Sequence, residues 1–121
     1  GSGGALGLAI GDSILMQEFA IYSVIPPEGC AAILWRDANQ KVEAAKALKI
    51  SAPELLELGV VDTIINEPCG GAHADQKQAA VLVDKVLSAT LDELDRDSIE
   101  TRLAKRYEKF RRMGNVGLSN S

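Results

Sequence analysis

The sequence predicts an α/β fold, because segments typical of strands and of helices alternate before two longer helices. Segments rich in β-branched or aromatic residues are typical of strands, and they lie at residues 13–18, 20–25 and 60–65. Segments with helical spacing or helix-start signals lie at residues 3–10, 28–35, 39–49, 51–58, 76–94 and 97–113. The run at 60–65 is largely aliphatic, which is typical of a strand buried on both faces.

The first of these helices, at residues 3–10, consists of small and aliphatic residues, which suit close packing against a neighbour. Gly11-Asp12 ends it. The strand at 20–25 ends at Pro26-Pro27, because neither proline has the N–H that a strand ladder needs. The helix at 28–35 begins directly after this pair.

Capping residues mark three further helix starts. In Ser51-Ala52-Pro53-Glu54 the serine caps the helix and the glutamate closes a capping box, and Gly59 ends this helix. Asp75 caps the helix that follows it, and Asp97-Ser98-Ile99-Glu100 forms a second capping box before the last helix, which Gly114 ends. Apolar residues recur at helical spacing after Asp75, namely Ala79, Leu82, Val83, Val86, Leu87 and Leu91.

Length and composition restrict the class of protein. The 121 residues are 46% hydrophobic and 25% charged, an ordinary balance for one globular domain or a piece of one. No apolar run approaches the roughly 20 residues of a membrane span, and no signal peptide is recognisable. Cys30 and Cys69 are too few for a disulfide framework or a zinc site, so we expect a reduced, cytoplasmic setting.

Charge is distributed unevenly along the chain. The net charge is -4 and the pI is near 5.0, which argues against a nucleic-acid interface over the whole domain. Residues 98–121 hold six basic and two acidic residues, so this segment carries +4 and the remainder -8. The basic last helix is therefore either a solvated surface or a dock for an acidic subunit face.

The glycine-rich segment Gly1-Ser2-Gly3-Gly4-Ala5 is the first candidate site, because it leads into a helix. Glycines let backbone N–H groups approach a ligand, and a helix N-terminus carries partial positive charge. Together they suit a phosphate, or an oxyanion that develops on a carbonyl. The segment is neither a P-loop nor a dinucleotide fingerprint, since no Gly-Lys-Ser/Thr follows and no strand precedes. A flexible linker is the alternative interpretation.

Two further segments offer polar or reactive groups. The corner from Tyr22 to Ala31 presents amides that line a pocket, unless it is purely structural. Cys30 as a nucleophile would need a base, and His73 is the only histidine. In Glu67-Pro68-Cys69-Gly70-Gly71-Ala72-His73, the histidine acts as a general base or ligand, or it bonds to backbone and fixes the loop. No metal site is expected in this chain, because Cys69 and His73 have no further ligands nearby.

In this order the segments resemble the α subunit of the bacterial and plastid-type acetyl-coenzyme A carboxylase carboxyltransferase. The resemblance covers residues 1 to about 110 and rests on Gly1 to Leu6, Gly11-Asp12, Tyr22 to Ile25, Pro27 to Ala31, Ile33 to Trp35, Ala44-Ala45, Ala47 to Ile50, Leu55 to Leu58, Asp62 to Ile65, Glu67-Pro68 and Gly70 to His73. The Pro-Glu-Gly-Cys-Ala and Gly-Gly-Ala-His pieces are specific in combination. Pro26 stands where the family usually has serine, and Cys69 stands where leucine is common.

The resemblance implies a fold. It is the crotonase-like β-β-α spiral of the ClpP/crotonase class, and this chain would be its C-terminal portion with trailing helices. Residues 1–75 would be the C-terminal part of the carboxyltransferase core, residues 76–113 helices for packing and subunit assembly, and residues 114–121 a flexible tail. Gly1 to Gly4 would belong to a native motif rather than to a linker.

The resemblance also implies a function. The family transfers a carboxyl group from carboxybiotin, on the biotin carboxyl carrier protein, to acetyl-coenzyme A, and forms malonyl-coenzyme A for fatty acid biosynthesis. Its α subunit supplies chiefly the biotin side of the site. A β subunit, which carries zinc, supplies the coenzyme A side in an α2β2 heterotetramer. The implied location is the cytoplasm, or the plastid stroma for a plastid-type enzyme.

The implied site residues come from the same match. Gly3 and Gly4 match the glycines whose N–H groups form the oxyanion hole. We expect substrate contacts from the residues around them, Ser2, Ala5, Pro27, Glu28, Gly29 and Cys30. The chain by itself is expected to be inactive, because half of the site lies on another chain.

Two other functions are consistent with the sequence. One is the carboxyltransferase of another biotin-dependent acyl-coenzyme A carboxylase or decarboxylase. The other is an interaction fragment without activity of its own, in which residues 76–113 assemble subunits. RNA binding would rest on the charge of the last helix alone.

Overall fold

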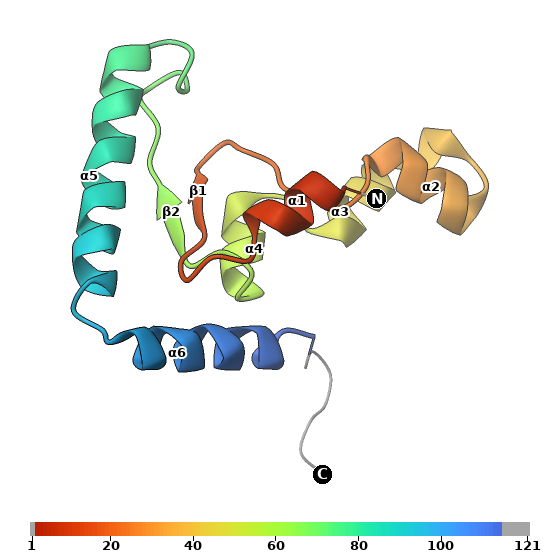
Figure 1. Cartoon of the computed structure of the whole chain (residues 1–121). Helices are drawn as coiled ribbons and strands as arrows, with labels where there is room; N and C mark the ends of the chain where they lie inside the picture. The colour runs from red at the N-terminus through yellow and green to blue at the C-terminus, as the bar shows by residue number, and fades with distance from the viewer. Residues whose placement is uncertain (1, 115–121) are drawn as a thin grey trace.

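The computed structural model describes residues 2–114, which form a mixed structure of helices and one small sheet (Figure 1). The elements in chain order are α1 (Gly3–Leu8), β1 (Leu15–Gln17), α2 (Pro27–Trp35), the 3-10 turn η1 (Ala38–Gln40), α3 (Lys41–Leu48), α4 (Ala52–Glu57), β2 (Thr63–Ile65), α5 (Gln76–Leu94) and α6 (Ile99–Arg112). The predicted mixture of helices and strands is confirmed. The predicted flexible tail, residues 114–121, lies outside the described part except for Gly114.

The sheet of the described residues consists of two short parallel strands. Leu15 of β1 pairs with Thr63 of β2, and the register continues to Gln17 and Ile65. Parallel strands are normally covered on both faces. Here only Ile65 of β2 is buried, while Thr63 and Ile64 are half-buried. The prediction that the strand at 60–65 is buried on both faces is therefore wrong for the described chain.

The strand predicted at residues 20–25 does not form. This segment makes a single antiparallel bridge, from Ile21 to Ser51, and the Tyr22 N–H donates to the Ile50 carbonyl at 3.1 Å. β-Branched residues favour extended backbone, but a ladder also needs a partner of matching length. Ser51 caps α4 at this point, so the partner segment turns into a helix.

The hydrophobic core is divided between two small clusters. The cluster beside the sheet contains Met16, Ala52, Leu55 and Val61. The second contains Cys30, Ala31 and Ala44, where α2 packs on α3. The second cluster depends on small side chains, because alanine lets α2 and α3 approach closely.

Large apolar side chains are exposed along several helices. Leu6 and Leu8 of α1 are 70% and 82% exposed, so the prediction that this helix packs tightly against a neighbour is wrong within residues 2–114. Leu87 and Leu91 of α5 are also exposed, although Ala79 of the same helix is buried. Apolar side chains exposed together in this way are typical of surfaces that another protein segment covers.

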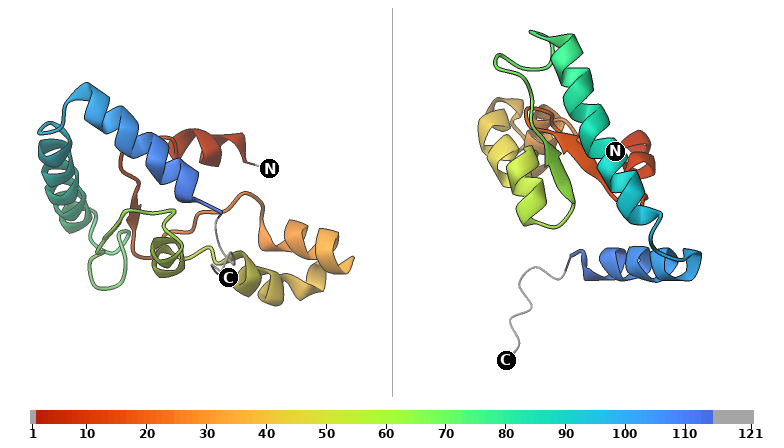
Figure 2. Two further views of the ribbon diagram at one scale, coloured as in Figure 1. Left: turned by 90° about the horizontal axis from the view of Figure 1, so that it is seen from below. Right: turned by 90° about the vertical axis from the view of Figure 1, so that its left-hand side faces the viewer.

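The last two helices, α5 and α6, lie along the outside of the body that α1 to β2 form (Figure 1). α5 contacts β2, and α6 leaves the lower end of α5 and runs past the body in a separate layer (Figures 1 and 2). None of the described helices is long and apolar enough to span a bilayer. The two predicted trailing helices are therefore present, with α6 less tightly packed than α5.

Local capping signals explain most helix starts. The Asp75 side chain accepts from the Gln78 N–H at 2.9 Å, as predicted. The predicted capping box at Asp97 is wrong by one residue, because Ser98 caps α6 by accepting from the Thr101 N–H at 3.2 Å. Asp97 instead forms an ion pair with Lys105 at 2.6 Å.

The capping box of α4 is complete. The Ser51 side chain accepts from the N3 N–H, and the Glu54 side chain accepts from the Ser51 N–H at 3.3 Å. The Ser51 hydroxyl also donates to the Glu54 carboxylate. Gly59 follows with a φ of +70°, the left-handed conformation that favours glycine.

The capping box makes a pH-dependent contribution to stability. Hydrogen bonds from the Ser51 side chain and backbone lower the pKa of Glu54 below its ordinary value of 4.5. A carboxylate whose pKa is lower in the folded state stabilises the fold above the unfolded pKa, and this stabilisation is lost as the pH falls through the folded pKa. We expect wild type to exceed a Glu54→Gln variant in melting temperature at pH 6, with the gap closing at pH values below 4.5. A constant gap across this range would contradict the assignment.

Candidate functional site

The candidate site is the start of α1, where the Ser2 side chain caps the helix. The Ser2 hydroxyl accepts from the Ala5 N–H at 3.0 Å, and the Ser2 carbonyl accepts from the Leu6 N–H at 3.2 Å. Gly3 and Gly4 occupy the first helical positions, whose N–H groups have no partner one turn earlier in a helix. The N-terminal end of α1 therefore presents backbone donors and no acidic side chain.

The two glycines face open space. At Gly3 and at Gly4 no heavy atom of residues 2–114 lies within 4 Å of the position that a Cβ would occupy. Both have negative φ, unlike Gly59 and Gly71. Neither the packing nor the backbone conformation of this chain therefore requires glycine at these positions, which leaves room for a ligand or another segment to approach the N–H groups.

The segment after β1 holds α1 in place through two contacts. The Ser2 N–H donates to the Val24 carbonyl at 2.9 Å. The Tyr22 hydroxyl, which is half-buried, donates to the Ala5 carbonyl. Tyr22 was placed from the sequence in a candidate corner for its backbone amides, but the role of its hydroxyl was not identified. The signal was present, because a buried tyrosine hydroxyl normally finds a hydrogen-bond partner.

The structure brings together two of the predicted contact regions, Ser2 and the start of α2. Both Ser2 and Pro27 line a cavity of about 370 Å³, together with Ile21, Ser23, Val24, Ile25, Pro26 and Ile50. The Ser23 hydroxyl donates to the Ile25 carbonyl at 2.8 Å and so shapes the turn before the prolines. The cavity is mainly apolar, and Ser2 and Ser23 are the polar residues among those that line it.

The other predicted contacts in α2 have different surroundings. Glu28 is exposed and pairs with Lys41 at 3.8 Å. A Cβ on Gly29 would lie 3.1 Å from the Ile25 side chain, so helix packing explains this glycine. Cys30 is buried against Ala31 and Ala44. These three residues do not line the cavity beside Ser2.

The structure does not bring Cys30 and His73 together. Cys30 belongs to the cluster between α2 and α3, whereas His73 lines a cavity of about 720 Å³ with Gln17 and Phe19. Figure 1 shows α2 and the loop before α5 at opposite ends of the molecule. A Cys30–His73 catalytic pair is therefore excluded within this chain.

Glu67 organises the loop that carries His73. One carboxylate oxygen accepts from the Phe19 N–H at 3.0 Å, and the other accepts from the Ala72 N–H at 2.6 Å. Gly71, with a φ of +91°, lies against the His73 ring, since a Cβ there would be 3.2 Å from the imidazole. The loop is thus fixed by Glu67 rather than by the histidine, and sequence reasoning missed this role.

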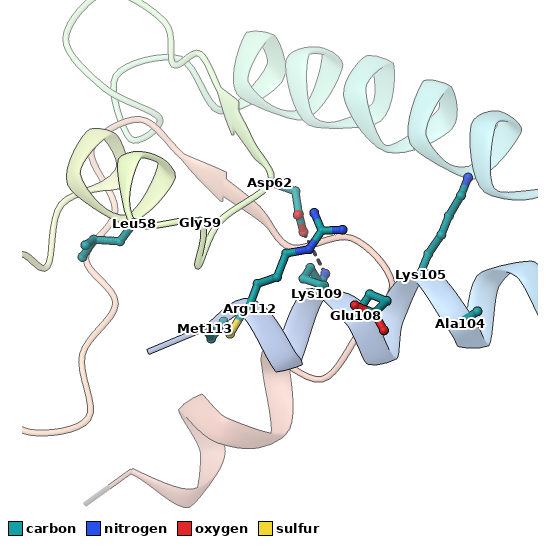
Figure 3. A pocket seen from close by; sticks show the side chains of 9 residues that line it. All are labelled: Leu58, Gly59, Asp62, Ala104, Lys105, Glu108, Lys109, Arg112 and Met113. Carbon is teal, nitrogen blue, oxygen red and sulfur yellow. Dashed lines mark hydrogen bonds and ion pairs between the residues drawn. The ribbon is translucent and has the colours of Figure 1, made fainter. Parts of the chain in front are cut away.

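A third cavity, of about 600 Å³, lies between α6 and the turn after α4 (Figure 3). It is lined by Leu58, Gly59, Asp62, Ala104, Lys105, Glu108, Lys109, Arg112 and Met113. Both lysines that line it already have acidic partners, because Lys105 pairs with Asp97 and Lys109 pairs with Asp62. Among residues 2–114 no group of three or more metal-ligating side chains occurs here or elsewhere.

The basic residues of α6 bind this chain's own acids. Arg106 approaches Asp12 at 3.6 Å and Lys109 approaches Asp62 at 3.0 Å. With Lys105 included, three of the six basic residues counted in the last segment are engaged within the chain. The positive charge available for an external partner is accordingly smaller than the sequence count indicates.

Comparison with known proteins assigns the chain to a family. The family model described as "Acetyl co-enzyme A carboxylase carboxyltransferase-like" matches residues 1–114. Proteins named acetyl-coenzyme A carboxylase carboxyl transferase subunit alpha are 55% identical in Sorangium cellulosum and 54% identical in Acaryochloris marina and in Pyropia yezoensis, each over 94% of this chain. The chain spans only 35–36% of the length of these relatives. The chain belongs to the acetyl-coenzyme A carboxylase carboxyltransferase-like family.

Proposed function

We propose that the chain is part of the α subunit of an acetyl-coenzyme A carboxylase carboxyltransferase. The proposal rests chiefly on the kinship over 94% of the chain with relatives that carry this name. The open N-terminus of α1 supports it from the structure. The substrates would be acetyl-coenzyme A and the carboxybiotin of a biotin carboxyl carrier protein, and the product malonyl-coenzyme A, in cytoplasm or plastid stroma.

The proposed role of Gly3 and Gly4 is to donate backbone N–H groups to an oxyanion. Negative charge develops on a carbonyl oxygen both when carboxybiotin releases its carboxyl group and when the thioester forms an enolate. Neutral donors held at a helix N-terminus stabilise such charge without reorganising during the reaction. This chemistry needs no side-chain nucleophile, which agrees with the burial of Cys30.

The cavity beside Ser2 is proposed to receive part of the substrate. Its mainly apolar lining, with Ser2 and Ser23 as the polar residues, suits an uncharged ring or chain with a few polar atoms. Of the predicted contacts, Ser2 and Pro27 line this cavity, and Ala5 lies one position beyond the glycines. Glu28, Gly29 and Cys30 are retained only as supports of the α2 start.

We also propose that the chain divides into a part of the carboxyltransferase core and a pair of assembly helices. Residues 1–75 would complete a crotonase-like β-β-α spiral with other segments of the subunit, since a two-stranded parallel sheet needs further cover. Residues 76–113 would serve packing and subunit assembly. The exposed apolar side chains of α5 and α6 support an assembly role. A β subunit that carries zinc, in an α2β2 heterotetramer, is the expected partner.

The function is tested by carboxyl transfer from malonyl-coenzyme A to biocytin. The full-length subunit that contains this sequence is assayed with and without a β subunit. We expect activity only in the mixture, because the coenzyme A side of the site would lie on the other subunit. The absence of transfer in every mixture of folded proteins would contradict the proposal, and transfer with another acyl-coenzyme A alone would favour a related carboxylase or decarboxylase.

A further inference from the structure

Lys109 of α6 binds three acceptors at once. Its ammonium donates to the Gly11 carbonyl at 3.1 Å, to the Asp12 carbonyl at 2.9 Å and to the Asp62 carboxylate at 3.0 Å. An ammonium has three donors, so this group is saturated within the chain. Its side chain is only 15% exposed. Lys109 is therefore a link inside the molecule and not a free cation for a ligand of the cavity in Figure 3.

The acceptors of Lys109 lie at the junction between α1 and β1. Gly11 and Asp12 follow the C-terminal end of α1 directly. Asp62 precedes β2, and the same carboxylate oxygen that binds Lys109 also accepts from the Ile14 N–H at 2.7 Å. Lys109 thus fixes the segment 9–14 directly, through the Gly11 and Asp12 carbonyls, and indirectly, through the Asp62 carboxylate that binds the Ile14 N–H.

The orientation of α6 supports a linking role. Arg106 and Lys109 face the body and reach Asp12 and Asp62, whereas Ile99, Leu103 and Tyr107 are exposed. A surface helix normally turns its apolar stripe towards the core. Within residues 2–114, the ion pairs of these two cations attach this helix to the body, beside the half-buried Phe110 and Met113.

α1 depends on such links because its own packing is weak. No α1 side chain is buried within residues 2–114, and Leu6 and Leu8 are exposed. The contacts from Ser2 and Tyr22 hold its first turn. The segment 9–14, which Lys109 fixes, holds its last turn.

We propose that Lys109 is a positioning residue for the N-terminus of α1. By holding the carbonyls of Gly11 and Asp12, it fixes the end of α1 and with it the position of the Gly3 and Gly4 N–H groups at the start of the helix. The effect on catalysis rests on the proposed function. The effect on the local rigidity of residues 2–14 does not.

Hydrogen–deuterium exchange of the full-length subunit tests the structural part. In Lys109→Met we expect amides of residues 2–14 to exchange about tenfold faster or more, the effect of losing charge-assisted hydrogen bonds in a locally opening segment. Peptides from α2 should be unchanged. The matched control is Lys105→Met, one turn earlier on α6 and 67% exposed, which should leave residues 2–14 unchanged.

Two results would overturn the proposal. One is equal exchange of residues 2–14 in Lys109→Met and Lys105→Met, and the other is an equal increase in α2, which would show a general loss of stability. Lys109→Gln, whose side-chain amide keeps two N–H donors but no charge, should show a smaller increase confined to residues 2–14. If Lys109→Met does not fold, the Lys109→Gln variant decides. The absence of faster amide exchange in residues 2–14 of Lys109→Gln would then contradict the proposal.

The catalytic part is tested by carboxyl transfer with the β subunit present. Lys109→Met should lower kcat about tenfold with little change in KM, Lys109→Arg should restore part of the rate, and Lys109→Met should add little to the loss in Gly4→Val. Additive losses would contradict an action through α1. If the wild type shows no transfer, the proposed function fails, while the exchange experiment still decides whether Lys109 holds α1.

Discussion

A Gly4→Val variant is expected to lose about 100-fold or more of the carboxyl-transfer rate, the size of effect seen when one oxyanion-hole donor is removed. The valine methyl groups would fill the open space in front of the first turn of α1, where no heavy atom of residues 2–114 lies within 4 Å of the Cβ position. The N–H would remain but a ligand could not reach it. The rate is measured with malonyl-coenzyme A and biocytin in the presence of the β subunit.

The matched control is Gly7→Val in the same helix. Gly7 also faces open space within the described chain, but it lies one turn away from the helix start. Valine has a slightly higher helix propensity than glycine, so both variants should fold with unchanged circular dichroism and still bind the β subunit. An unaffected rate in Gly4→Val, or an equal loss in Gly7→Val, would contradict the oxyanion role.

A Leu55→Ala variant is expected to lose about 2–5 kcal/mol of the free energy of unfolding, the usual cost of truncating a buried leucine. Leu55 is 6% exposed and packs with Met16, Ala52 and Val61 in the cluster beside the sheet. Its carbonyl also accepts from the Val60 N–H at 2.9 Å. Because this core is small, few other side chains can move into the cavity that the substitution leaves.

Urea denaturation of this chain, followed by circular dichroism, measures the effect. The matched control is Leu56→Ala, on the same helix and 43% exposed, which should change the free energy of unfolding by about 0.5 kcal/mol or less. A similar loss in both variants would show that α4 is oriented differently from the structure described here.

Predictions from sequence succeeded where the signal is local. The capping box at Ser51 and Glu54, the Asp75 cap and the glycine stops at Gly59 and Gly114 each involve residues within one turn of each other. The prediction at Asp97 was wrong by one residue, because Ser98 is an equally good cap and Lys105 binds the aspartate. Helices with their boundaries could therefore be predicted to within one or two residues.

Predictions of strands and packing were less successful, because they depend on partners elsewhere in the chain. The segment 20–25 has the composition of a strand, but it meets Ser51 at only one bridge. The small residues of α1 indicated a packed helix, yet its leucines are exposed within residues 2–114. In both cases the sequence pattern specifies what a segment favours and not what lies beside it.

The candidate site shows the same division. The prediction of Gly3 and Gly4 rests on a helix start and on family resemblance and stays a prediction, while Ser2 and Pro27 do line one cavity. The side-chain contacts of Tyr22, Glu67 and Lys109 were missed.

The sequence by itself determined the family, the mixture of helices and strands, and the helix starts with their caps, since these depend on local composition and short spacings. Only the tertiary structure decided which side chains hold the site together. The Asp62 carboxylate and the Ile14 N–H are 48 residues apart, and Lys109 and the Gly11 carbonyl are 98 residues apart. Such contacts form when folding brings distant segments together, and no spacing within the sequence indicates them.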